Sequence, residues 1–156
     1  MGALHVSAVI DDPELRRLYD YWAERRGGRL APSRTDIDPA ELTWILPRLM
    51  LIDVADDIGD FRVRLMGTEV AKEFGEDRTG QRFAEIDGVE NLDQVFAIYE
   101  QVARDCVPHY ERERPVSELR SYRGYSRLML PLSDGGPGAS MILVGLAYFG
   151  RRISDG

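Results

Sequence analysis

The stretch 32–68 constrains the fold more than any other, because it contains signals for a helix start, a helix stop, a strand and a second helix start. Asp38-Pro39-Ala40-Glu41 combines an N-cap Asp, a proline at the first helical position and an acid at N3. This pattern predicts a helix, which Pro47 would end. The apolar face of that helix would consist of Leu42, Ile45 and Leu46.

The residues after Pro47 predict a β-hairpin followed by a short helix. Leu49–Val54 and Phe61–Met66 have the composition of strands, and the polar residues between them suit a turn. Alternation predicts that Phe61, Val63 and Leu65 point into the core, with Arg62 and Arg64 on the outer face. Thr68 is the expected N-cap of a helix that runs to Phe74.

An earlier amphipathic helix is predicted near the N-terminus. Asp12 is its expected N-cap, Pro13 occupies the first helical position and Gly27-Gly28 ends it. The apolar residues at i, i+3, i+4 and i+7 are Leu15, Leu18, Tyr19 and Trp22. This helix must cover an apolar surface elsewhere in the protein.

The second half predicts one long helix and three strands. Asn91 begins a capping box, and Leu92, Val95, Phe96, Tyr99, Val102 and Ala103 follow at helical spacing. The strands are expected at His109–Val116, Tyr125–Leu132 and Ala139–Phe149. Both faces of the last strand are apolar, so both should be covered. The middle helices would cover one face, and the N-terminal helices or a second subunit would cover the other.

Composition limits the class of function. The 156 residues suit a single globular domain, and the net charge of −7 argues against nonspecific binding to nucleic acid or to an anionic membrane. Cys106 is the only cysteine, so no internal disulfide and no cysteine-rich metal site is expected. With no apolar run near the length of a membrane span and no signal-peptide pattern, the expected location is cytoplasmic.

The order of two strands, helices and three strands resembles a PAS domain. The motifs that carry the resemblance are Tyr21-Trp22, Gly28-Arg29, Pro32-Ser33-Arg34, Asp36-Ile37-Asp38-Pro39, Leu46-Pro47, Ile52-Asp53-Val54, Phe61–Leu65, Gly67-Thr68 and Thr79-Gly80. They are similar to a family of small, stand-alone PAS proteins of alphaproteobacteria.

The resemblance implies an α+β fold, a five-stranded antiparallel sheet with helices on one face. The expected division is a helical extension over residues 1–48, which packs on the sheet or on a dimer partner, a PAS-like domain over 49–150 and a tail over 151–156. It implies a non-enzymatic signalling module that acts through an unidentified protein partner or a small molecule. No catalytic residue is transferred from the family.

A ligand pocket in this fold would lie between the sheet and the middle helices. The candidates to line it are Phe74, Phe83, Tyr99, Met129 and Met141. The alternative is that these side chains simply fill the core. Haem and flavin are not expected, because His109 follows Pro108 instead of lying on a helix and Cys106 lacks the flavin-adduct context.

Four charged residues are predicted to clamp the N-terminal segment onto the sheet. Asp38 caps a helix, and Asp36 would pair with Arg64 or Arg34 on the outer face. The same two aspartates could be metal ligands, but a metal site would need further ligands nearby. The structural role is therefore the favoured interpretation, and no metal site is predicted.

An arginine-rich stretch contains Arg112, Arg114, Arg120, Arg123 and Arg127, with Tyr110, Tyr122 and Tyr125 interleaved. Arginine beside aromatic rings can clamp phosphates or other anions. Because Glu111, Glu113 and Glu118 are interspersed, the favoured interpretation is a solvated strand edge whose charges pair with one another. An anionic ligand is the alternative.

The apolar last strand and the N-terminal helix together predict a homodimer. Its contact would include Leu18, Tyr19 and Trp22. A different class of function is also considered, a small enzyme or carrier that binds an apolar ligand in an α+β cone. An enzyme of this kind needs a carboxylate in an apolar pocket, for which Asp53 and Glu73 are the nearest candidates.

Overall fold

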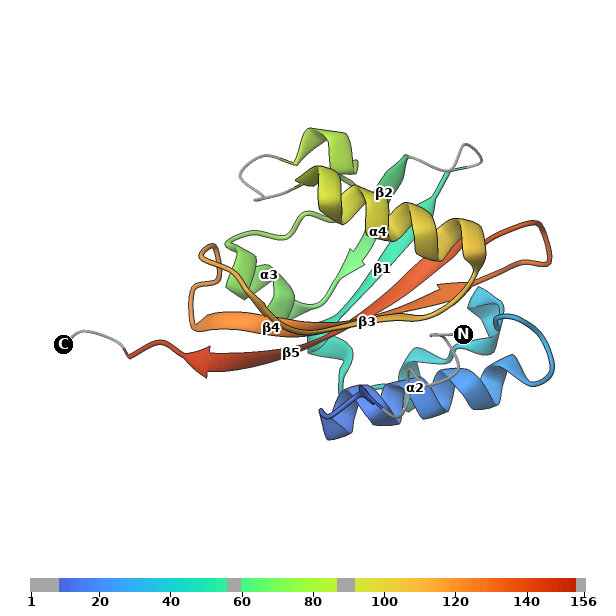
Figure 1. The fold of residues 1–156 in the computed structure, drawn as a ribbon, viewed down its shortest axis with the longest axis horizontal. Helices are drawn as coiled ribbons and strands as arrows, with labels where there is room; N and C mark the ends of the chain where they lie inside the picture. Colours follow the sequence, from blue (N-terminus) through green and yellow to red (C-terminus); the bar gives the residue numbers. More distant parts are fainter. Residues whose placement is uncertain (1–8, 56–59, 87–91, 154–156) are drawn as a thin grey trace.

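The computed structural model describes residues 9–55, 60–86 and 92–153, and it contains an antiparallel sheet with the strand order β2-β1-β5-β4-β3 (Figure 1). The strands are β1 (Leu49–Val54), β2 (Phe61–Met66), β3 (His109–Pro115), β4 (Tyr122–Leu132) and β5 (Met141–Arg151). The helices are α2 (Pro13–Arg26), α3 (Thr68–Phe74) and α4 (Leu92–Asp105). The predicted α+β fold with five antiparallel strands is confirmed.

Helices lie on both faces of the sheet. In Figure 1, α4 and α3 lie on one face and α2 crosses the other. Gly145 of β5 marks the contact with α2, because a Cβ built there would be 2.7 Å from Leu18 Cδ2 and 3.0 Å from Leu15 Cδ2. The absence of a side chain at Gly145 lets α2 approach the middle of the sheet.

Helix α2 forms as the sequence predicts. Asp12 Oδ1 accepts hydrogen bonds from the backbone N–H groups of Glu14 and Leu15, each at 3.0 Å. The buried side chains of the helix are Leu15, Leu18 and Trp22. Trp22 also donates from Nε1 to the carbonyl oxygen of Pro131 in β4, at 2.8 Å.

The predicted dimer contact is wrong for two of its three residues. Leu18 and Trp22 have no exposed surface within their own chain, because α2 itself covers the apolar outer face of the sheet. Tyr19 is half-buried. A second subunit is therefore not needed to cover this part of β5.

The second predicted helix is replaced by short 3-10 turns at Pro39–Glu41 and Leu46–Arg48. Asp38 does act as the expected cap, since its Oδ1 accepts from the backbone N–H of Ala40 at 3.0 Å. Nucleating an α-helix is costly, and prolines lie near both ends of this segment. Two of the three predicted apolar residues, Leu42 and Ile45, are at most 1% exposed, and Leu46 is half-buried.

A bulge in β2 overturns the predicted inward position of Leu65. Leu51 pairs with Leu65 but Ile52 pairs with Val63, so Arg64 is an extra residue in β2. A bulge reverses the alternation of side chains beyond it. Leu65 is consequently 50% exposed, and Met66 points into the core instead.

The other boundaries differ from the predictions by three residues or fewer. Gly67, not Thr68, is the N-cap of α3, and it makes no side-chain capping bond. Strand β4 begins three residues earlier than predicted, and β5 is shifted by two residues. The predicted long helix is α4, whereas its predicted cap Asn91 lies outside the described residues.

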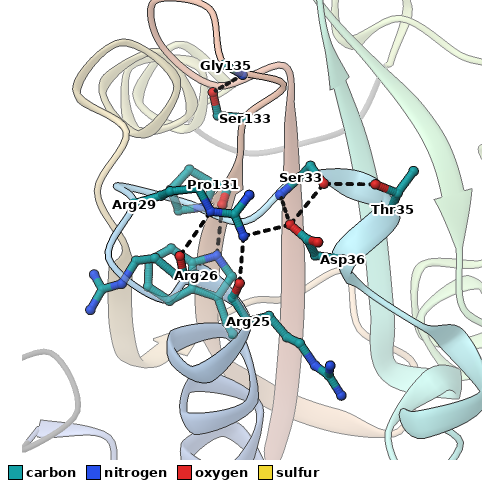
Figure 2. Close-up of polar contacts among 10 residues, drawn as sticks. Arg25, Arg26, Arg29, Ser33, Thr35, Asp36, Pro131, Ser133 and Gly135 are labelled. Atoms are coloured by element: carbon teal, nitrogen blue, oxygen red, sulfur yellow. Dashed lines mark hydrogen bonds and ion pairs between the residues drawn. The ribbon is translucent and has the colours of Figure 1, made fainter.

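The turn that follows α2 is joined to the end of this helix by an ion pair other than the predicted one. Figure 2 shows Arg29 bridging the end of α2 and the following turn. Arg29 Nη2 donates to Asp36 Oδ2 at 2.8 Å and to the carbonyl oxygen of Arg25 at 2.9 Å. Asp36 also accepts from the backbone N–H of Ser33 at 2.9 Å. These contacts, first the Ser33 hydrogen bond and then Arg29, lower the pKa of Asp36.

The predicted pairing of Asp36 with Arg64 or Arg34 is therefore wrong. Arg64 lies 3.6 Å from Asp53 Oδ2, on the outer face of the hairpin. Arg34 donates from Nη1 to the carbonyl oxygen of Ile37 at 3.1 Å. Arg29 and the backbone of Ser33 satisfy the carboxylate of Asp36 within a local turn, so it pairs with neither Arg34 nor Arg64.

Candidate functional site

A cavity of about 440 Å³ lies between the inner face of the sheet and the helices α3 and α4. Its apolar lining comes from all of these elements. The apolar and aromatic residues are Met50, Ile52, Val63, Met66, Phe74, Phe83, Ile86, Leu92, Val95, Tyr99, Pro115, Val116 and Tyr125. This volume is within the usual range of small-molecule sites, about 300–1,000 Å³.

One end of the cavity is bordered by packed aromatic rings. Phe83 and Tyr99 meet edge to face with their centroids 4.9 Å apart, and Phe61 of β2 packs against both. Phe96 of α4 completes this cluster, 5.5 Å from Phe83. The cluster fixes α4 against β2 and leaves the space beside it open.

Three of the five predicted lining residues border the cavity, and two do not. Phe74, Phe83 and Tyr99 are in its wall. Met129 of β4 is fully buried, but it does not border the cavity. Met141 was placed on the wrong face, because alternation along β5 puts it on the same face as Gly145, against α2.

The charged lining is mainly basic. Arg78, Arg114 and Arg127 border the cavity, and Glu118 is the one carboxylate in the described wall. Arg78 lies 3.5 Å from the exposed carboxylate of Glu76. Arg114 and Arg127 come from neighbouring strands, β3 and β4, and both face the cavity.

Arg114 and Arg127 converge on one oxygen of Glu111. Arg127 Nη2 lies 2.8 Å from Glu111 Oε2, and Arg114 Nη1 lies 3.4 Å from the same oxygen. The strand register brings them together, because Glu111 pairs with Arg127 and Arg114 pairs with Tyr125 across β3 and β4. Two guanidinium groups thus share one carboxylate.

The side chain of Arg127 is only 4% exposed. Its guanidinium lies 5.6 Å from the centroid of the Tyr99 ring, and its Nε has no hydrogen-bond partner among the described residues. A buried donor without a partner costs about 1–3 kcal/mol. The site therefore contains a buried cation whose hydrogen-bonding capacity is only partly used.

Glu111 is held in its ionised form. Burial alone would raise its pKa, but contact with His109 and the positive charges of Arg127 and Arg114 outweigh burial and lower the pKa to about 2. For the phenol of Tyr99, burial outweighs the neighbouring positive charge of Arg127 and raises the pKa to about 12. The pKa of Tyr125 is raised for the same reason. At neutral pH, both phenols are protonated and can donate hydrogen bonds.

The two carboxylates considered for an enzyme lie outside the cavity wall. Asp53 is on the outer face of β1, near Arg64. Glu73 is buried, and its Oε1 accepts from the backbone N–H of Ser121 at 2.7 Å. Neither of them borders the cavity.

The residues considered for haem and flavin are likewise outside the wall of the cavity. His109 is half-buried at the start of β3, with Nε2 3.4 Å from Glu111 Oε1. Cys106 is buried just after α4, and burial raises the pKa of its thiol. Within residues 9–55, 60–86 and 92–153, no cluster of three or more His, Cys, Asp or Glu side chains could hold a metal ion. None of the described helices is long and apolar enough to cross a membrane.

Sequence reasoning placed Arg127 in a solvated strand edge, which is wrong. The signal that could have revealed its burial was the composition of β4, where Arg127 is flanked by Tyr125 and Ser126 on one side and an apolar run on the other. Arginine is rarely buried unless it is paired, and here β4 is an inner strand and Arg127 pairs with Glu111.

A comparison with protein families is consistent with this geometry. A family model described as a PAS domain matches residues 10–147. The match begins before α2 and ends within β5, so it spans the covering helix, the cavity and most of the sheet. Comparisons with curated proteins and with solved structures found no match.

Proposed function

The chain belongs to the PAS domain family, and on that premise we propose that it is a non-enzymatic sensor that binds a small molecule in the cavity and thereby changes its affinity for a protein partner. PAS domains are signalling or sensory modules. The observation that carries the proposal is the cavity of about 440 Å³ between the sheet and α4, with apolar walls and a few convergent polar groups.

Signal transmission would pass through α4. This helix contributes Leu92, Val95 and Tyr99 to the wall, and its other side includes exposed residues such as Ala97. A ligand that contacts the inner side would favour one position of the helix over others, and a partner on the outer side would bind that position preferentially.

The non-enzymatic part of the proposal is supported by where the carboxylates lie. General acid–base catalysis requires an ionisable group within hydrogen-bond reach of the substrate. Asp53 and Glu73, the two carboxylates considered for an enzyme, are outside the cavity wall, and Glu111 is ion-paired with two arginines. Glu118 is the one carboxylate in the described wall. A homodimer remains part of the proposal, and it would use a surface other than the buried Leu18 and Trp22.

We expect an organic extract of the source cells to stabilise the purified protein against heat, because a ligand that binds only the folded state raises the melting temperature. Val95→Phe, which adds a ring inside the cavity, should abolish this shift. Ala97→Phe is the matched control, since it adds a ring to the exposed side of the same helix and should leave the shift intact.

The molecule recovered from the complex separates the sensor from the enzyme. Release of the unchanged molecule supports sensing, whereas conversion to a product would identify the protein as an enzyme. An equal shift in the wild type and in Val95→Phe would place binding outside the cavity and contradict the proposal.

A further inference from the structure

We propose that the cavity selects molecules with a carboxylate head group and an apolar body, and that Arg114 and Arg127 bind the head group. This inference rests on the proposed function, because it specifies the ligand of the same cavity. It is argued from the charge balance of the wall, from the unused donors of Arg127 and from the apolar character of the remaining lining.

The charge balance at Arg114 and Arg127 favours an anion beside these two residues. Arg114 and Arg127 share the single negative charge of Glu111, which leaves one positive charge of the three groups without compensation. The charge of Arg78 is compensated by Glu76, 3.5 Å away, and Glu118 adds one negative charge to the wall. In a cavity partly shielded from water, an uncompensated cation attracts an anion more strongly than it would on the surface.

The hydrogen-bonding geometry favours a carboxylate over a simple halide or water. Guanidinium presents five N–H donors in a planar fork that matches the two oxygens of a carboxylate. Arg127 is 4% exposed and its Nε has no partner among the described residues. The neighbouring phenols of Tyr99 and Tyr125 are further donors at the same wall.

The remaining wall specifies an apolar body. Val63, Phe74, Phe83 and Val95 are apolar residues of the same wall. A cationic head group would face two guanidiniums, and a neutral head group would supply no negative charge to Arg127 beyond that of Glu111. An amphipathic carboxylate therefore suits a wall that combines guanidinium groups with apolar side chains.

Three probes of equal chain length test the head-group preference by isothermal titration calorimetry at neutral pH: decanoate, 1-decanol and decylamine. We expect decanoate to bind at least about tenfold more tightly than 1-decanol, and decylamine to bind least, since charge-assisted bonds to arginine are stronger than neutral ones. Equal affinity for all three would overturn the inference and leave the cavity proposal standing. If none of the three probes binds, the result counts against the carboxylate inference and against the cavity proposal.

A matched pair of variants on β3 locates the head group. Arg114→Gln should reduce the preference for decanoate over 1-decanol by about tenfold or more while leaving 1-decanol binding unchanged. Arg112→Gln is the control, because Arg112 is 47% exposed and pairs with Asp11 outside the cavity. Arg127→Lys keeps the charge but not the fork, so it should lower the preference only in part. A preference unchanged in both Arg114→Gln and Arg127→Lys would overturn the assignment.

Discussion

Trp22→Ala should lower the free energy of unfolding by about 3–5 kcal/mol, the usual cost of removing a large aromatic side chain from a core. Trp22 has no exposed surface, and its indole N–H donates to Pro131 in the inner strand β4. The truncation removes packing between α2 and the sheet and leaves an accepting carbonyl without this donor. Equilibrium unfolding in urea, followed by circular dichroism, measures the change.

Trp44→Ala is the matched control, since it makes the same chemical change at a half-buried tryptophan that packs against Arg17. It should cost much less than Trp22→Ala. Equal losses in the two variants would mean that α2 does not form part of the core, and the single-chain covering of the sheet would then be wrong.

Glu111→Gln should also destabilise the protein strongly, by about 3–5 kcal/mol, because it removes the charge that compensates a buried arginine. The side chain of Arg127 is 4% exposed and cannot reach solvent without a rearrangement of β4. The double variant Glu111→Gln/Arg127→Met should recover much of the loss, since both charges are then gone. Urea unfolding of the three variants beside wild type gives the comparison. A Glu111→Gln variant as stable as wild type would show that the pair contributes no net stability.

The same pair predicts a pH dependence. The pKa of Glu111 is lowered from 4.5 to about 2 in the folded protein, so its contribution is fully present above about pH 4.5 and is lost as the pH falls toward 2. At about 1.4 kcal/mol per pH unit, the contribution is about 3 kcal/mol. Asp36 and Asp77 also have lowered pKa values, but both residues are present in wild type and in Glu111→Gln, so their effects cancel when the two proteins are compared. Wild type should therefore lose more stability than Glu111→Gln between pH 5 and pH 2.

The fold could be predicted because its signals are local. The Asp12 cap and the apolar spacing of α2 act within one helix, and the doubly apolar β5 required cover on both faces. The bulge at Arg64 could not be predicted, since it depends on the register between β1 and β2. For the same reason the inward position of Leu65 was wrong and Met66 was missed.

The candidate site was predicted only in part. Aromatic residues on α3 and α4 were correctly placed at the cavity, because helical periodicity sets which side faces the sheet. The cluster of Glu111, Arg114 and Arg127 was missed, since it forms through cross-strand register and through the inner position of β4. A run of interspersed charges in the sequence suggests an exposed strand. The burial of Arg127 follows from the neighbouring strands and α4, whose positions the sequence pattern does not give.

Native mass spectrometry of the full chain, purified directly from its source cells and compared with the same sample denatured, tests the central claim most directly. The account predicts a native mass that exceeds a whole number of chains by one small molecule per cavity, and loss of this excess on denaturation. The same spectrum reports the number of subunits. Native and denatured masses that differ only by a whole number of chains would contradict a ligand-sensing cavity.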